Sequence, residues 1–124
     1  MADKLTLGYV GIGLMGLPMA QRLAGLGWRV RAYDIVEARI AAAAASGVEA
    51  AASPADAARG ADVVLLNLPT NDAVEQAVFG AQGLAGAMRA PQLLVDFSTI
   101  PVEACQSHAA RLREESGCRW VDAP

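Results

Sequence analysis

The chain has 124 residues, of which 54% are hydrophobic and 19% are charged, and its net charge is −3. This length suits one domain with its own hydrophobic core. The acidic balance, with a pI near 5.0, argues against a nucleic-acid-binding surface, which would need clustered lysine and arginine. No apolar run reaches the roughly 18 residues of a membrane span. The first residues do not resemble a signal peptide, so we expect a cytoplasmic protein without a membrane partner.

Strand and helix patterns alternate along the chain. An apolar run over 5–10 predicts the first strand, and apolar residues at helical spacing over 15–26 predict the first helix, which ends at Gly27. Further strands are predicted at 29–33, 48–51, 62–68, 93–97 and 119–121. Further helices are predicted at 37–46, from an N-cap at Ser53 to Gly60, at 71–79 and at 101–116, with a loop and a helical turn over 80–91. This order predicts an α/β fold of the Rossmann type, a doubly wound and mostly parallel sheet of about six strands with helices on both faces.

A glycine-rich turn, Gly11-Ile12-Gly13-Leu14-Met15-Gly16, joins the first predicted strand to the first predicted helix. Gly11 permits the tight turn, Gly13 lets the backbone approach a pyrophosphate, and Gly16 lets the helix pack closely on the strand. The start of the helix adds N–H groups and a partial positive charge for phosphates. The glycines in this context predict a dinucleotide site.

Asp34 ends the second predicted strand, where this fold places a carboxylate over the adenosine ribose. A carboxylate there binds the ribose hydroxyls and repels a 2′-phosphate, which favours NAD over NADP. Arg31 faces the other side of the strand, but Arg39 on the next helix could reach the ribose, so NADP stays open. The alternative is that Asp34 only caps the following helix.

Polar residues also follow the central strand, at the carboxyl edge where open α/β sheets bind their ligands. The segment Leu68-Pro69-Thr70 lies there, and Thr70 and Asn71 could contact the cofactor or merely cap the next helix. Ser98-Thr99, after the fifth strand, leaves the same two options.

The remaining reactive side chains predict no catalytic or metal centre. Cys105 and Cys118 fit no metal or redox spacing, and we interpret them as buried or idle thiols. His108, the only histidine, falls in the middle of a predicted helix, about two turns past the carboxyl edge. We therefore expect a surface or flanking histidine without a part in the reaction.

Together the motifs resemble those of the β-hydroxyacid dehydrogenases, the group of 3-hydroxyisobutyrate dehydrogenase and tartronate semialdehyde reductase. The glycine signature continues as Leu17-Pro18-Met19-Ala20, which is more specific than the glycines alone. The other matches, in the family's order, are Tyr33-Asp34, Leu68-Pro69-Thr70, Asp96-Phe97-Ser98-Thr99 and Asp122-Ala123-Pro124. The resemblance implies a nicotinamide cofactor that oxidises a small β-hydroxy acid or reduces its semialdehyde. It implies cofactor contacts at Gly11, Gly13, Met15, Gly16, Asp34, Leu68, Pro69 and Thr99, with Thr99 near the nicotinamide.

In that family the chain continues past the D-A-P stretch into a serine-glycine-glycine substrate loop, a helix with the catalytic lysine and a helical second domain. We therefore expect residues 1–124 to be the dinucleotide-binding domain, with the catalytic lysine beyond Pro124. Lys4, the only lysine, precedes the first strand and cannot serve at the opposite edge of the sheet, so we expect cofactor binding without turnover. The alternative is a nucleotide-sensing or partner-binding module. Without the second domain, apolar surface and an edge strand stay open, which predicts self-association through 119–121 or 101–116.

Overall fold

The computed structural model describes residues 5–124, in which six strands form one parallel sheet with the order β3-β2-β1-β4-β5-β6. The strands are β1 (Thr6–Val10), β2 (Arg29–Tyr33), β3 (Glu49–Ala50), β4 (Val63–Leu66), β5 (Leu93–Asp96) and β6 (Arg119–Asp122). Each strand lies where the sequence predicts one, and β3 is shorter than expected. The predicted Rossmann-type fold is confirmed.

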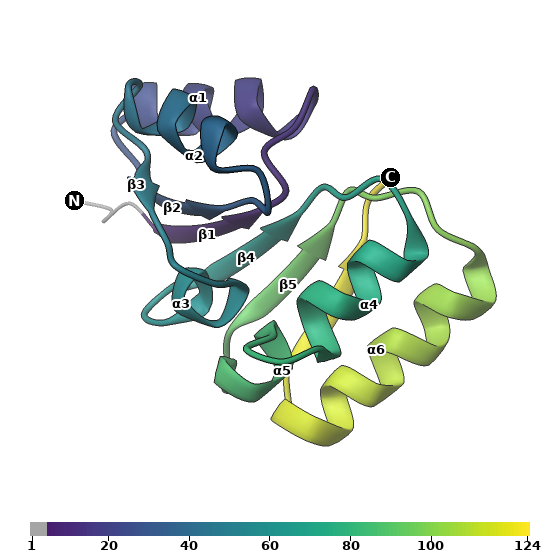
Figure 1. Cartoon of the computed structure of the whole chain (residues 1–124). Coiled ribbons are helices and arrows are strands. Elements are labelled where there is room, and N and C mark those ends of the chain that lie inside the picture. The colour runs from purple at the N-terminus through teal and green to yellow at the C-terminus, as the bar shows by residue number, and fades with distance from the viewer. Residues whose placement is uncertain (1–4) are drawn as a thin grey trace.

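Helices cover the sheet on both faces (Figure 1). On one face lie α1 (Gly16–Gly25) and α2 (Glu37–Ala44), packed over the β1–β3 side of the sheet. On the opposite face lie α3 (Pro54–Ala58), α4 (Asn71–Phe79), α5 (Leu84–Ala87) and α6 (Val102–Ser116). Between residues 5 and 124 no helix has the length and apolar character needed to cross a membrane.

Local capping explains where α3 begins. The Ser53 hydroxyl accepts a hydrogen bond from the Asp56 N–H at 3.0 Å, and Pro54 takes the first helical position, where its missing N–H costs nothing. Asp56 also accepts a bond from the Ala52 N–H and pairs with Arg31 of β2 at 3.0 Å. The Ala52 N–H is the main reason why the pKa of the Asp56 carboxyl is lowered. These contacts fix a five-residue helix that is too short to be stable alone.

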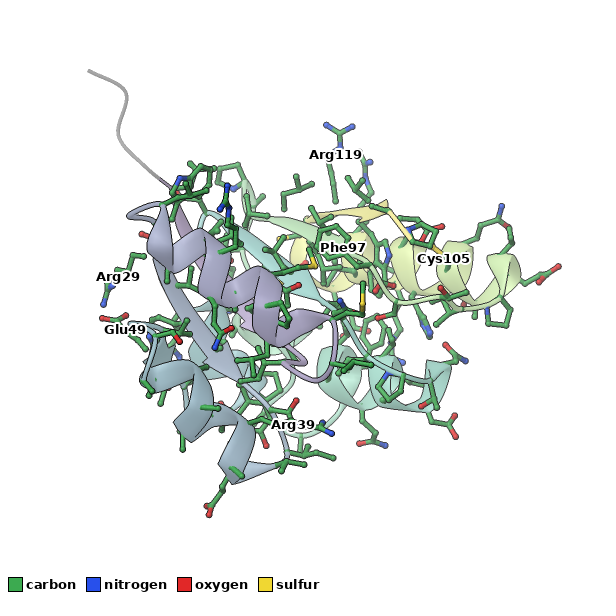
Figure 2. All side chains as sticks on the ribbon, turned by 90° about the horizontal axis from the view of Figure 1, so that it is seen from above. Arg29, Arg39, Glu49, Phe97, Cys105 and Arg119 are labelled. Atoms are coloured by element: carbon green, nitrogen blue, oxygen red, sulfur yellow. The ribbon has the colours of Figure 1, made fainter. Side chains whose placement is uncertain are left out.

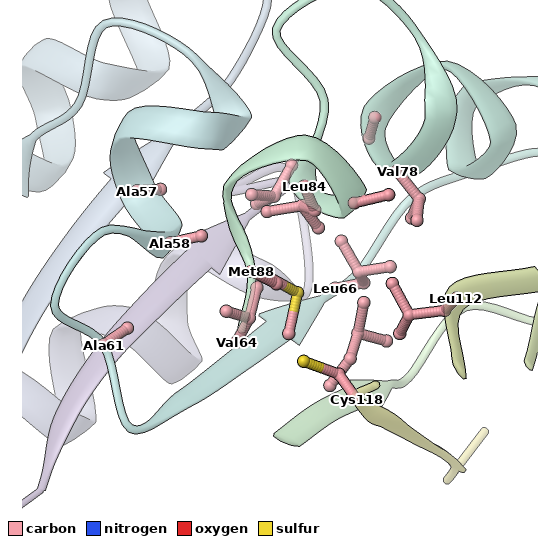
Figure 3. Packing of buried hydrophobic residues seen from close by; sticks show 14 of the residues in the cluster. Ala57, Ala58, Ala61, Val64, Leu66, Val78, Leu84, Met88, Leu112 and Cys118 are labelled. Atoms are coloured by element: carbon pink, nitrogen blue, oxygen red, sulfur yellow. The ribbon is translucent and has the colours of Figure 1, made fainter. Parts of the chain in front are cut away.

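The larger hydrophobic cluster lies between the sheet and the helices α3 to α6 (Figure 3). Its fully buried members include Leu66 of β4, Leu84 of α5, Met88 directly after α5, and Leu112 of α6. Cys118 belongs to the same cluster, and both cysteines are buried and free. Burial raises the pKa of the Cys105 thiol, which favours its protonated form.

α3 approaches β1 more closely than any side chain would allow. A Cβ added to Gly8 would lie less than 3.0 Å from the backbone oxygen of Ala57, a separation that real Cβ atoms do not show. Ala57 and Ala58 are fully buried at this contact. Gly8 therefore sets the distance between the sheet and α3.

The sequence predicts a surface or flanking histidine at position 108, and the surface position is wrong. Its side chain is buried, with Nε2 2.8 Å from the amide oxygen of Asn71 at the start of α4. The ring lies between Phe79 and Trp120, with centroid distances of 5.6 and 5.8 Å. His108 lies three residues after Cys105, so both side chains fall on the buried face of α6. The contact with Asn71 gives the buried Nε2 a hydrogen-bond partner.

One half of the sheet stays open on the side of α1 and α2. There β4 and β5 present the half-buried Val63 and Val95, and Phe97 follows β5 on the same side. Val121 of β6 is 43% exposed, and β6 is the edge strand. In Figure 2, Phe97 and Arg119 lie beside α1 rather than beneath it. We call Val63, Val95, Phe97 and Val121 the open sheet face.

Candidate cofactor-binding site

The turn after β1 requires glycine at its first position. Gly11 has φ +96°, and its N–H donates to the Tyr33 oxygen at the end of β2 at 3.0 Å. A Cβ there would lie less than 3.0 Å from the Asn67 oxygen that follows β4. Gly11 therefore sits where the ends of β1, β2 and β4 converge, and only a residue without a side chain fits.

Gly16 and Gly13, the other two glycines of the turn, have different physical roles. A Cβ on Gly16 would lie less than 3.0 Å from the Gly11 oxygen, so this glycine is needed for packing. A Cβ on Gly13 would meet nothing closer than Nη1 of Arg39, at 3.5 Å. Packing does not require glycine at position 13, and its absent side chain leaves backbone open to the pocket. No side chain caps the start of α1 beside it.

Asp34 connects the end of β2 to both neighbouring segments. Its side chain is 5% exposed, Oδ2 accepts the Ile12 N–H at 3.0 Å, and Oδ1 accepts the Val36 N–H at 2.8 Å. Val36 is the N-cap residue of α2, and no side chain caps that helix, so the alternative that Asp34 is a helix cap is wrong. Asp34 instead fixes the backbone on both sides of the pocket described next, which it also lines.

A pocket of about 740 Å³ opens above these turns, at the carboxyl ends of β1, β2 and β4. This volume lies within the usual range of small-molecule and cofactor sites. Seven of the predicted cofactor residues line it, namely Gly11, Gly13, Met15, Gly16, Asp34, Leu68 and Pro69. The pocket also has walls that sequence reasoning missed, among them Pro54, Asn67 and Gln76. Asn67 could have been predicted as a pocket residue, because it directly follows the buried strand β4. Pro54 and Gln76 belong to no cofactor-binding motif.

Thr70 and Thr99 do not line this pocket. The Thr70 hydroxyl accepts the Ala73 N–H at 3.0 Å and so caps α4, one of the two options that the sequence left open. Thr99 is exposed and follows β5 on the same edge of the sheet. Its predicted contact with the nicotinamide stays a prediction.

Ser98 ties the two turns at this edge together. Its buried hydroxyl accepts the Leu68 N–H at 2.8 Å, while its own N–H donates to Oδ1 of Asp96 at 2.8 Å. The Leu68 backbone that lines the pocket is therefore held from below by the turn after β5.

Asp96 is fully buried, and its Oδ2 has no hydrogen-bond partner among the described residues. Burial raises the pKa of the Asp96 carboxyl, against the opposing effect of its hydrogen bonds with Ser98. Because the folded state favours the protonated form, this group stabilises the fold at low pH. The contribution is lost as the pH rises through the raised pKa. Asp96 does not line the pocket, and we assign it to the support of the Ser98 turn.

Residues 6–124 match the family described as the NAD binding domain of 6-phosphogluconate dehydrogenase. The chain is 33% identical to 2-(hydroxymethyl)glutarate dehydrogenase of Eubacterium barkeri, over 100% of this chain and 41% of the relative. It is 36% identical to NAD-dependent L-serine dehydrogenase of Pseudomonas aeruginosa, over 95% of this chain and 39% of the relative. The solved 3-hydroxyisobutyrate dehydrogenase of Mycobacterium tuberculosis, with L-serine, superposes with a TM-score of 0.89 at 34% identity, over 98% of this chain and 40% of that chain.

The chain spans about 40% of the length of the curated relatives it matches. The resemblance to the β-hydroxyacid dehydrogenases, first drawn from the motifs, is confirmed by these relatives. The fold, the glycine turn and the match over nearly the whole chain agree. The chain belongs to the family of NAD-binding domains represented by that of 6-phosphogluconate dehydrogenase, in the form found in hydroxyacid dehydrogenases.

Proposed function

We propose that this chain binds NAD(H) for an oxidoreductase that acts on a small β-hydroxy acid or its semialdehyde. The observation that carries the proposal is Gly13, whose open backbone faces a pocket of cofactor size although packing there does not require glycine. The relatives named as dehydrogenases of 2-(hydroxymethyl)glutarate, L-serine and 3-hydroxyisobutyrate support the substrate class.

The residues of the pocket can be assigned roles from their chemistry. The backbone at Gly13 and the uncapped start of α1 would hold the pyrophosphate. Asp34 would accept hydrogen bonds from the ribose hydroxyls, and its charge favours NAD over NADP by repelling a 2′-phosphate. Leu68 and Pro69 would form an apolar wall. The bound nicotinamide supplies the hydride exchange, and these residues bind and orient it.

The proton-transfer group of the reaction lies, in this proposal, outside the 124 residues. Lys4 is the only lysine and lies outside the described residues. His108 is buried beneath α4 and does not line the pocket. In the part of the chain that the structure describes, the pocket is lined by neither a lysine nor a histidine, and we propose cofactor binding without turnover by this chain.

Titration of the 124-residue chain with NADH, followed by nicotinamide fluorescence, tests the proposal. We expect saturable NADH binding and weaker NADPH binding. We also expect no competition by S-adenosylmethionine, the cofactor of methyltransferases, whose glycine loop can resemble residues 11–16. When 3-hydroxyisobutyrate or L-serine is added to the chain together with NAD, the absorbance of NADH should not increase. Absence of NADH binding would overturn the proposed function, and measurable turnover would overturn the claim that the chain only binds cofactor.

We also propose that the chain in isolation associates with itself through the open sheet face. Exposed apolar surface beside an unpaired edge strand favours pairing with another chain. Light scattering after size-exclusion chromatography should show species larger than a monomer at high concentration. A Val121→Asp variant should shift them toward the monomer, because it places a charge on that face. A monodisperse wild-type monomer at high concentration would contradict this proposal.

A further inference from the structure

We infer that Arg39 is a residue that determines cofactor specificity, and that it limits how strongly the pocket prefers NAD over NADP. The inference rests on the proposed function, since it concerns the same pocket. It assigns to Arg39 the part of a movable cation beside the fixed carboxylate of Asp34.

Arg39 lies on α2 and reaches over the glycine turn (Figure 2). Its Nη1 is 3.4 Å from Oδ1 of Asp34. The same guanidinium passes within 3.5 Å of the position that a Cβ on Gly13 would take. Arg39 thus lies between the part of the pocket suited to phosphates and the part suited to the ribose.

Arg39 is the only cation that lines the pocket in the described part of the chain, where Asp34 and Asp72 contribute negative charge. NADP differs from NAD by a phosphate on the ribose, next to Asp34 in the proposed pose. A guanidinium can pair with a phosphate through two parallel hydrogen bonds, and no other side chain lining the pocket carries a positive charge.

The two partners differ in their freedom to move. Asp34 is held by the N–H groups of Ile12 and Val36 and is almost fully buried. The Arg39 side chain is 49% exposed, and its contact with Asp34 is longer than an ordinary charge-assisted hydrogen bond. Arg39 can therefore turn from Asp34 to a phosphate while the carboxylate stays in place.

This difference predicts opposite dependence on the two cofactors. With NADP, the guanidinium would offset the repulsion between Asp34 and the 2′-phosphate. With NAD, the ribose hydroxyls satisfy Asp34 and the guanidinium has no phosphate to meet at that position. Loss of the cation should therefore weaken NADP binding selectively and increase the preference for NAD.

The test compares Arg39→Ala with Arg29→Ala by fluorescence titration with NADH and NADPH. Arg29 is the matched control, because it also pairs with a carboxylate, Glu49, at 2.9 Å, but lies at the opposite end of β2 and outside the pocket. We expect Arg39→Ala to raise the Kd for NADPH about tenfold and that for NADH less than about threefold. Arg29→Ala should leave the ratio of the two values unchanged, and Arg39→Lys should recover part of the NADPH affinity.

Thermal melting by circular dichroism establishes that each variant is folded, and Arg39→Gln replaces Arg39→Ala if the latter is not. Equal losses for NADH and NADPH would overturn the inference, since Arg39 would then be a general phosphate contact. An unchanged ratio would also overturn it, as would an equal effect of Arg29→Ala. A wild-type chain that binds neither cofactor overturns the proposed function as well, whereas NADH binding with an unchanged ratio overturns only the role of Arg39.

Discussion

A Gly16→Ala variant is expected to lose NADH binding and to be strongly destabilised. The added Cβ would overlap the backbone oxygen of Gly11, which belongs to the same turn and cannot swing aside as a side chain could. Overpacking costs about 1–3 kcal/mol where side chains can adjust, and a clash with backbone should reach the upper end or exceed it. Moving α1 away from β1 also displaces the uncapped helix start from the pocket.

Gly25→Ala is the matched control for this prediction, because Gly25 closes the same helix and a Cβ there would meet nothing within 4 Å. Its stability should be unchanged or higher, since alanine favours a helix by up to about 1 kcal/mol over glycine. Urea denaturation and NADH titration measure the two effects. If Gly16→Ala has the same urea midpoint as Gly25→Ala and binds NADH normally, the inference that α1 packs too closely on β1 for a side chain is wrong.

A Gly8→Ala variant is expected to be destabilised by about 3 kcal/mol, although Gly8 lies outside the glycine signature. Its Cβ would overlap the Ala57 oxygen, so either α3 lifts from the sheet or β1 distorts. Pro54 opens α3 and lines the pocket, so NADH binding should weaken as well, by less than in Gly16→Ala.

The control for Gly8 is Gly86→Ala in α5, where a Cβ would again meet nothing within 4 Å. The midpoint of urea unfolding should fall for Gly8→Ala and stay or rise for Gly86→Ala. Equal midpoints would show that α3 tolerates a side chain beneath it.

These two glycines mark what the sequence could and could not predict. Gly16 belongs to a local signature, because the turn and the start of α1 are consecutive in the chain. Gly8 is constrained by Ala57, which is distant in sequence and meets it only once α3 has packed across β1. A strand pattern alone gives no reason to single out Gly8.

Burial of His108 was missed for a similar reason. Its environment is assembled from Asn71 and Phe79 of α4 and Trp120 of β6, and a histidine is buried only when such partners satisfy it. Helical spacing with Cys105 indicated the face but not the partners. The carboxyl-edge residues were easier to predict, since parallel strands bring their ends to one edge.

The two backbone bonds of Asp34 have a consequence for redesign of this domain. An engineer who wishes to change the coenzyme would first replace this carboxylate. Asparagine offers one acceptor oxygen in place of two, so either Ile12 or Val36 would lose its partner. In the proposed function, coenzyme selectivity and the integrity of the turn are therefore linked at position 34. Position 39, whose side chain is half exposed, is where the proposed role of Arg39 predicts that coenzyme choice can be altered with the scaffold left intact.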